Sequence, residues 1–197
     1  MEKLKIGYPV IVEGKYDRLR LLSVMEGQVL TTDGFGIFKN KEKLALLRAL
    51  AKKTPVVVLT DPDGAGKLIR AHIGSAIPKE RIIPLYVPQI KGKEKRKAEP
   101  SAEGTLGVEG QERELLYGLL APLAADAPIV ESPLSKVDFY EDGLTGCENA
   151  TARRDALAAQ FGMPAGMTPN ALLAALRVVA SFEEYKQAVA ALPTEKD

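Results

Sequence analysis

The sequence has few of the residues that build disulfides and soft-metal sites. It contains one cysteine, Cys147, one histidine, His72, and no tryptophan. A single cysteine excludes an intrachain disulfide framework and any zinc site made of several thiolates. Neither residue has the neighbouring pattern of a catalytic dyad or triad. We therefore expect Cys147 to be structural and His72 to be a packed or surface residue.

Long apolar runs are also missing. No stretch approaches the roughly eighteen consecutive apolar residues that indicate a membrane-spanning helix, and no secretory signal peptide is recognisable. We therefore expect a soluble, cytoplasmic protein without a membrane partner.

Neither sign of charge is in strong excess. Lysine and arginine number 27 and aspartate and glutamate number 26, which gives a formal net charge of +1. This balance does not indicate a nucleic-acid-binding protein, but local clustering of charge decides that property more than the sum does. With 197 residues, 46% of them apolar, the chain can form one ordinary domain with a sizeable core and a small second domain.

The N-terminal half alternates strand-like apolar runs with segments of helical spacing. The expected strands are 8–13, 28–32, 56–60 and 82–87, and the expected helices are 16–25, 41–52 and 65–72. Such alternation predicts an α/β fold with a mainly parallel sheet flanked by helices.

The pattern changes after residue 88. Segment 88–103 lacks apolar periodicity and contains a basic run at 91–97, so we expect an exposed, partly mobile loop. Order is expected again at 104–109. The segments expected next are a helix at 112–120, a proline-containing linker at 121–135, and helices at 150–161, 169–179 and 182–192. We therefore divide the chain into an α/β domain at 1–122 and a small all-helical C-terminal domain at 136–197.

Two acidic fragments about fifty residues apart follow expected strands. Glu13 ends the first apolar run, and Asp61 and Asp63 end the second. Carboxyl ends of parallel strands form the crevice where open α/β sheets bind ligands. Three acids gathered there repel one another unless a cation joins them, and hard oxygen ligands suit Mg²⁺. We therefore expect Glu13, Asp61 and Asp63 to be catalytic and metal-binding. Helix capping is the commoner role of a lone Asp, but this combination favours the metal site.

Glycines after the second fragment invite comparison with a phosphate-binding P-loop. The comparison fails, because Asp61 stands where a P-loop has glycine and Leu68 where it has serine or threonine. A nucleotide-binding regulator is therefore weakly supported. The glycines instead allow a tight strand-to-helix turn and a close approach to a phosphate.

Basic residues near the acids and farther along the chain are candidate contacts to RNA phosphates. A solvated surface explains each of them about equally well, and no aromatic residues interleave with them as a stacking surface requires. If RNA binds, recognition of its shape and phosphates is favoured over reading of its bases. The candidates are Lys15, Lys67, Arg70, Lys93, Lys95, Arg96, Arg153 and Arg154.

These fragments also carry a family resemblance. Segments 10–17 and 61–66 resemble the Toprim domain of topoisomerases, bacterial primases and certain nucleases. The closer similarity is to one branch, the ribonucleases that mature 5S rRNA in Gram-positive bacteria. It is carried by Ile11–Lys15, Thr60–Asp63, Ile69–Arg70, Gly107–Glu109, Gly143–Gly146, Asn149–Ala150, Arg153–Arg154 and Phe182–Glu184. The resemblance thus spans nearly the whole chain.

The resemblance implies a Toprim-like catalytic domain, an appended helical domain that binds RNA or a partner, and a Mg²⁺-dependent endoribonuclease. Its implied substrate is a double-helical region of precursor 5S rRNA, and its implied helper is a 5S-binding ribosomal protein. Glu13, Asp61 and Asp63 would be the catalytic and metal-binding acids, with Asp17 and Glu109 as possible contributors.

The chain departs from the family pattern at three places. Lys67 stands where the family usually has Glu, Gly110 where it often has His, and segment 91–103 is lengthened. These departures affect how the protein would bind its substrate more than the reaction that it would catalyse. Two rival functions stay open: a Toprim nuclease that acts on DNA, and a non-catalytic RNA-binding or ribosome-assembly factor.

Overall fold

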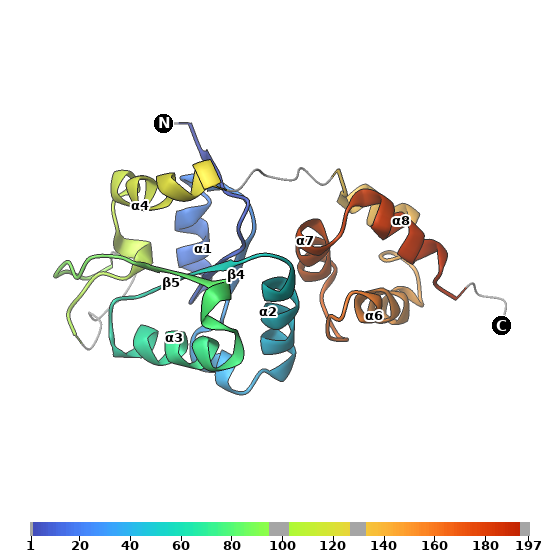
Figure 1. Cartoon of the computed structure of the whole chain (residues 1–197), viewed down its shortest axis with the longest axis horizontal. Coiled ribbons are helices and arrows are strands. Elements are labelled where there is room, and N and C mark those ends of the chain that lie inside the picture. The colour runs from blue at the N-terminus through green and yellow to red at the C-terminus, as the bar shows by residue number, and fades with distance from the viewer. Residues whose placement is uncertain (1, 95–102, 127–132, 194–197) are drawn as a thin grey trace.

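The computed structural model describes residues 2–94, 103–126 and 133–193. An α/β part and a helical part lie side by side, and α7 of the helical part faces α2 of the α/β part (Figure 1). Within the described ranges, no helix combines the length and apolar character needed to cross a membrane.

A four-stranded parallel sheet forms the centre of the α/β part. Its strands, in spatial order, are β4 (Val29–Thr31), β2 (Val10–Val12), β5 (Val56–Thr60) and β6 (Ile82–Tyr86). All four expected strands are therefore present, and the fold class is confirmed. Because the strands are parallel, their carboxyl ends meet at one edge of the sheet.

Helices cover both faces of this sheet. They are α1 (Lys15–Leu21), α2 (Lys41–Lys53), α3 (Gly64–Ala76) and α4 (Arg113–Asp126). Alternate residues of a strand face opposite sides, and β5 shows this directly. Val56 and Val58 join the core of α2 and α3, whereas Val57 and Leu59 join the core of α1 and α4. The continuous apolar runs thus reflect burial on both faces.

Two expectations for the α/β part were wrong in detail. The helix expected over 16–25 ends at Leu21, because Met25 and Glu26 form a short strand, β3, that pairs in parallel with β1 (Leu4–Lys5). Tertiary pairing thus overrides the helical spacing. The helix expected to stop at residue 120 continues through Pro122 to Asp126, into the expected linker. Burial of Leu120 and Leu123 on this helix offsets the hydrogen bond that proline removes.

Segment 88–106 is more ordered than we expected. The backbone amide of Gly92 donates to the carbonyl of Gly104 at 3.0 Å, and the amide of Leu106 donates to the carbonyl of Ile90 at 2.8 Å. Glu94, which we expected on an exposed loop, is only 3% exposed. The two ends of the segment therefore run side by side, and residues 95–102 lie outside the described residues.

The helical part begins with a helix that we did not predict. Its helices are α5 (Lys136–Glu141), α6 (Ala150–Gln160), α7 (Pro169–Val179) and α8 (Phe182–Ala190). Two of these helices have side-chain N-caps: Thr168 accepts from the amide of Ala171 at 3.2 Å, and Ser181 forms a capping box with Glu184. Buried residues of α7 and α2 belong to one core, so the two parts share apolar packing.

Among the described residues, three short 3₁₀ helices connect these elements. They are η1 (Gly34–Phe38), η2 (Lys79–Arg81) and η3 (Val108–Gly110). Of the three, η3 packs against α1 at the carboxyl edge of the sheet. It therefore brings residues from beyond position 100 to the ends of β2 and β5.

Candidate active site

Two of the three expected acids meet at the carboxyl edge of the sheet. Glu13 follows β2 directly and Asp61 follows β5 directly, and these two strands are neighbours. The carboxylate of Glu13 accepts a hydrogen bond from the backbone amide of Asp61 at 2.8 Å. The pairing of β2 with β5 therefore brings together two residues that are 48 positions apart.

Asp63 has a different position. It is the N-cap of α3, and its carboxylate accepts a hydrogen bond from the amide of Gly66 at 2.9 Å. It does not appear among the residues that line the cavity beside Glu13 and Asp61. Its negative charge nevertheless helps to raise the pKa of Glu13. The helix-capping role that we weighed against metal binding is thus present at this residue.

A cavity of about 190 Å³ opens beside Glu13 and Asp61. Five carboxylic acids contribute to its lining, and they come from four separate stretches of the chain. These acids are Glu13, Asp17, Asp61, Glu94 and Glu109. We call this space the acidic cavity. Gathering five acids around so small a volume creates an excess of negative charge that favours a cation.

Two glycines allow the backbone to close around Asp61. A side-chain carbon at Gly66 would lie 2.2 Å from the carbonyl oxygen of Asp61 and 2.8 Å from the carboxylate of Glu13. A carbon at Gly107 would lie 2.3 Å from the Asp61 carboxylate. Next to Gly107, the amide of Val108 donates to Asp61 Oδ1 at 2.8 Å. The carboxylate of Asp61 is therefore held in place by a loop that only glycine can bring this close.

Asp17 connects α1 to η3 beneath the cavity. It is 8% exposed, and its carboxylate accepts from the amide of Gly14 at 2.9 Å and from the amide of Glu109 at 3.1 Å. The structure therefore places Asp17 where it supports the loop that carries Glu109. Glu109 itself lines the acidic cavity.

Glu94 is a cavity residue that the sequence did not reveal. Its carboxylate accepts from the amide of Gly107 at 2.9 Å, and Gly107 in turn packs against Asp61. In the sequence, Glu94 lies within a run of lysines and arginine that lacks apolar periodicity. We find no local signal that separates this glutamate from a solvated one, because its burial depends on the return of the chain at residues 104–107.

Burial and mutual repulsion change the acidity of two cavity residues. The pKa of Glu13 is raised from 4.5 to about 7, chiefly because the side chain is desolvated and next because Asp61 is negatively charged. The pKa of Asp17 is raised from 3.8 to about 7 by the same two causes in the same order. In the absence of a cation, each of these two carboxyl groups therefore holds its proton more tightly than it would in water.

The residues at the cavity fit Mg²⁺ through a small set of oxygen ligands. In the parts of the chain that the structure describes, no three His, Cys, Asp or Glu side chains are arranged to hold a metal ion together. Mg²⁺, however, commonly uses one or two protein carboxylates and completes its octahedron with water and substrate phosphate. Glu13 and Asp61, joined by a hydrogen bond at the mouth of a negatively charged cavity, provide such a pair.

The candidate RNA-contacting residues do not form one cluster. Lys15 and Lys67 are exposed on the first turns of α1 and α3, next to the acids, and Lys93 is exposed on segment 88–106. Lys95 and Arg96 lie outside the described residues. Arg70 points inward, and its guanidinium donates to the carbonyl of Asp61 at 3.0 Å and to the hydroxyl of Thr60.

The two arginines of the helical part are held by its backbone. Arg153 donates to the carbonyls of Asp142 and Pro193 at 3.2 and 3.0 Å. Arg154 donates to the carbonyl of Leu144 at 2.7 Å. These bonds fix the loop before α6 and the end of the chain after α8, so both side chains have a structural role.

Comparison with known proteins shows which family the chain resembles. Residues 9–90 match the Toprim domain family. The chain is 34% identical over 153 residues to "Ribonuclease M5 1" of Ligilactobacillus salivarius (strain CECT 5713). The aligned region covers 78% of this chain and 75% of that protein. It is 30% identical over 162 residues to "Ribonuclease M5" of Lactiplantibacillus plantarum, covering 81% of each. It is 28% identical over 156 residues to "Ribonuclease M5" of Bacillus subtilis (strain 168), covering 78% and 77%. These similarities confirm the resemblance seen in the sequence.

Proposed function

Because the chain belongs to the ribonuclease M5 family, we propose that it is a Mg²⁺-dependent endoribonuclease that cleaves a double-helical region of precursor 5S rRNA. The observation that carries this proposal is the hydrogen-bonded pair of Glu13 and Asp61 at the mouth of the acidic cavity. We further propose that the protein acts in the cytoplasm and is assisted by a 5S-binding ribosomal protein.

In this proposal, Glu13 and Asp61 hold the metal ion, and Asp63 adds negative charge beside them. When bound, Mg²⁺ supplies Lewis-acid polarisation of the phosphodiester and an activated water. The chain's own part is to orient these carboxylates. Val108 fixes one oxygen of Asp61, and the amide of Asp61 fixes one oxygen of Glu13. Glu13 acts either as a ligand of the metal ion or as the general base that accepts a proton from the attacking water.

Asp17, Glu94 and Glu109 have supporting roles in the proposed mechanism. Asp17 and Glu94 accept backbone hydrogen bonds from the loop that carries Gly107 and Glu109. They therefore position the wall of the cavity opposite Asp61. Glu109 lines the cavity and is placed to orient water or a hydrated cation.

The candidate basic residues are proposed to contact the RNA backbone around this edge. Lys15 and Lys67 flank the acids and are exposed, so they are placed to meet phosphates next to the cleaved bond. Because Lys67 stands beside Asp63 in the first turn of α3, it offsets some of the local negative charge. We propose that the α/β part at 1–122 carries catalysis and that the helical part at 136–197 contacts RNA or the partner protein.

The direct test is cleavage of a precursor 5S rRNA transcript by the purified protein. Discrete cuts are expected with Mg²⁺, and none with EDTA or with the Asp61→Asn variant. The reaction is run with and without the 5S-binding ribosomal protein, and a DNA copy of the same hairpin serves as the competing substrate. If the protein binds the transcript but does not cut it in Mg²⁺, with or without the ribosomal protein, the catalytic proposal is overturned. If the DNA copy is cut as fast as the RNA, the assigned substrate class is overturned.

A further inference from the structure

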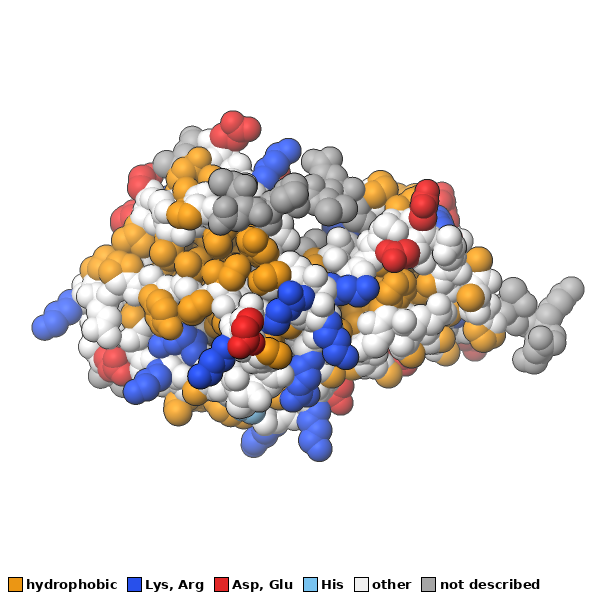
Figure 2. Space-filling model, viewed as in Figure 1, with side chains coloured by type: hydrophobic (Ala, Val, Ile, Leu, Met, Phe, Trp, Pro, Cys, Tyr) orange, Lys and Arg blue, Asp and Glu red, His pale blue; other side chains and the backbone are white. Residues whose placement is uncertain are grey.

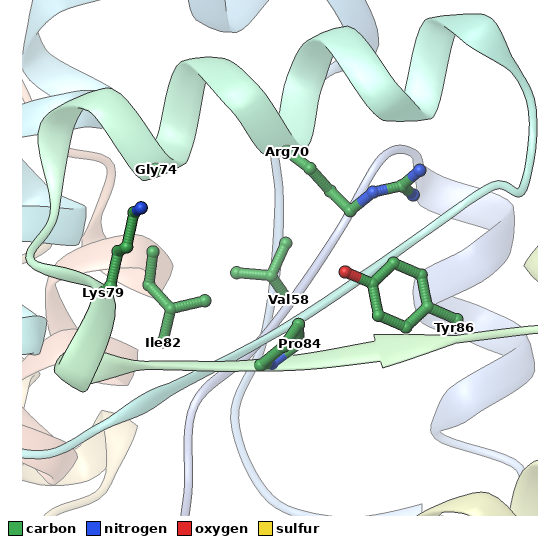
Figure 3. Close-up of a pocket in the computed structure, with 7 residues that line it drawn as sticks. All are labelled: Val58, Arg70, Gly74, Lys79, Ile82, Pro84 and Tyr86. Carbon is green, nitrogen blue, oxygen red and sulfur yellow. The ribbon is translucent and has the colours of Figure 1, made fainter.

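A second hollow lies between α3 and the edge strand β6. It has a volume of about 290 Å³, and seven residues line it (Figure 3). They are Val58, Arg70, Gly74, Lys79, Ile82, Pro84 and Tyr86. We call it the α3–β6 groove. Its position on the outer side of β5 separates it from the acidic cavity, which lies on the β2 side.

The groove has an apolar floor and a cation toward each end. Val58, Ile82 and Pro84 form the floor, Arg70 comes down from α3 at one end, and Lys79 stands at the other (Figure 3). None of the seven lining residues is acidic. On the face of the α/β part shown in Figure 2, apolar side chains gather with Lys and Arg side chains along their border. The groove thus pairs apolar surface with positive charge.

Tyr86 is an exposed aromatic ring at the Arg70 end of the groove. It is 58% exposed, and the guanidinium carbon of Arg70 lies 5.2 Å from the centre of its ring. Such a cation–π pair holds the ring in a fixed orientation. A large aromatic side chain left open to solvent beside an arginine is a typical platform for a nucleic-acid base.

The aromatic end of the groove is directly connected to the proposed catalytic acid. Arg70 donates to the backbone carbonyl of Asp61 at 3.0 Å, and Tyr86 pairs with Thr60, the residue before Asp61, across the β5–β6 ladder. A strand of RNA with a phosphate at the acidic cavity therefore passes the end of β5 before it reaches Tyr86. The two sites are thus linked through Arg70 and the end of β5.

We propose that the α3–β6 groove binds an unpaired nucleotide that flanks the cleaved double-helical region of the RNA substrate, with its base stacked on the face of Tyr86 that Arg70 leaves open and its phosphates beside Arg70 and Lys79. The proposal rests on the proposed function and adds a recognition element to it. Stacking suits any base, because every base has a π face. The site therefore recognises an unpaired nucleotide rather than a particular sequence.

The edge strand itself argues against a peptide as the occupant. A peptide that extended the sheet would need a continuous row of backbone donors and acceptors along β6. Pro84, at the centre of β6, has no backbone N–H to contribute. A proline at this place is a common way to prevent strand addition at a sheet edge. The groove is therefore better suited to a base and its phosphates.

A substitution at Gly74 can fill part of the groove and so test whether it binds a nucleotide. A side-chain carbon added at this helical glycine meets no other atom within 4 Å, and the residue lines the groove. Gly74→Leu therefore places an apolar side chain in the Lys79 end of the groove, away from Tyr86 (Figure 3), and narrows the space for the nucleotide without disturbing the core. Gly118→Leu is the matched control, because Gly118 is also a helical glycine with open space around it, on α4.

The binding test uses a fluorescein-labelled single-stranded hexaribonucleotide and fluorescence anisotropy in EDTA, where no cleavage occurs. Tyr86→Ala is expected to weaken binding roughly tenfold, which is the size of one lost base stack. Gly74→Leu, which fills the Lys79 end of the groove, is also expected to weaken binding. Tyr86→Phe, which keeps the ring, and Gly118→Leu are expected to bind as the unchanged protein does. Unchanged hexamer affinity in Gly74→Leu overturns the proposal. A variant that no longer binds the 5S-binding ribosomal protein but still binds the hexamer with unchanged affinity also overturns the proposal.

A parallel cleavage assay separates this inference from the proposed function. If the unchanged protein cleaves the precursor and Gly74→Leu cleaves it at an equal rate at limiting RNA, the groove proposal fails and the nuclease stands. If the unchanged protein cleaves nothing but the hexamer binds through Tyr86, the catalytic proposal fails and the groove stands. Circular dichroism of each variant shows that the fold is intact.

Discussion

The acidic cavity and the α3–β6 groove lie on either side of β5, yet they use charge in opposite ways. On the β2 side, five carboxylic acids surround one space, and two of them have pKa values raised to about 7. On the β6 side, the lining carries two cations and no acid. Arg70 lies between them, with its guanidinium on the carbonyl of Asp61 and against the ring of Tyr86.

This contrast suggests a division of work at the end of one strand. In the two proposals above, negative charge concentrates a cation where the phosphodiester is cut, whereas positive charge and an aromatic ring hold a flanking nucleotide. The catalytic side needs side chains fixed by backbone hydrogen bonds, as found for Asp61 and Glu13. The binding side needs an open apolar surface, an exposed ring and nearby cations.

The largest effect is expected from Asp61→Asn, which removes one charge from the cavity and keeps an acceptor for the amide of Val108. Loss of a metal-holding carboxylate is expected to lower the rate of transcript cleavage by at least about a hundredfold. Initial rates at saturating Mg²⁺ measure it. Glu114→Gln, an exposed acid in the first turn of α4, is the control and is expected to cleave normally. A fully active Asp61→Asn protein would falsify the assignment of the acidic cavity.

Gly107→Ala tests whether close packing around Asp61 is needed. The added carbon would lie 2.3 Å from the carboxylate of Asp61, so the loop must shift. The backbone at Gly107 has a φ of −78°, which alanine adopts freely, so the effect is purely steric. We expect a loss of about 1–3 kcal/mol in the free energy of unfolding, together with reduced cleavage.

Denaturant unfolding measures this loss, with Gly118→Ala on α4 as the comparison. That substitution meets open space and replaces a helical glycine, so it is expected to raise stability slightly. If both alanine variants unfold at the same denaturant concentration as the unchanged protein, the loop is not packed against Asp61 as described.

The raised pKa values predict how Mg²⁺ and pH act together on stability. Without metal, Glu13 and Asp17 bind protons more tightly in the folded protein than in the unfolded chain. Their contribution to stability is therefore present below about pH 4 and is lost as the pH rises through about 7. A cation in the cavity offsets this loss by favouring the charged forms.

The measurement is the melting temperature with and without Mg²⁺ at pH values on both sides of 7. The gain in melting temperature on adding Mg²⁺ is expected to be larger above pH 7 than at pH 5, and to shrink in Asp61→Asn. A gain that is equal at both pH values, or that survives unchanged in the variant, contradicts cation binding at these carboxylates. The groove variant Gly74→Leu is expected to show the same gain as the unchanged protein.

The smallest effect is expected from Lys79→Ala at the far end of the groove. Removing one phosphate contact is expected to weaken hexamer binding by a few-fold and to lower the slope of its salt dependence by about one unit. Titrations at several salt concentrations measure both. The same substitution should leave the Mg²⁺-dependent gain in melting temperature unchanged, because Lys79 is remote from the cavity. A steeper salt slope in the variant would contradict a phosphate contact there.

Much of the fold was predictable because its signals are local. The strand at 56–60 and the helix at 169–179 have the expected bounds, since buried strands and capped helices leave a clear periodicity in the sequence. The meeting of Glu13 and Asp61 followed from the parallel sheet. The short strand β3 and the continuation of α4 were missed, because pairing with β1 and core packing overrode local spacing and proline.

The sequence by itself determined the alternation of strands and helices, the acids at the ends of two strands and the family to which the chain belongs. Only the tertiary structure decided that Glu94 is buried in the cavity, that Asp63 caps a helix, and that Tyr86 and Arg70 stand together beside Asp61. The physical reason is the range of the interactions. Periodicity and capping act over a few residues, whereas burial, charge repulsion and stacking depend on segments that meet only when the chain folds.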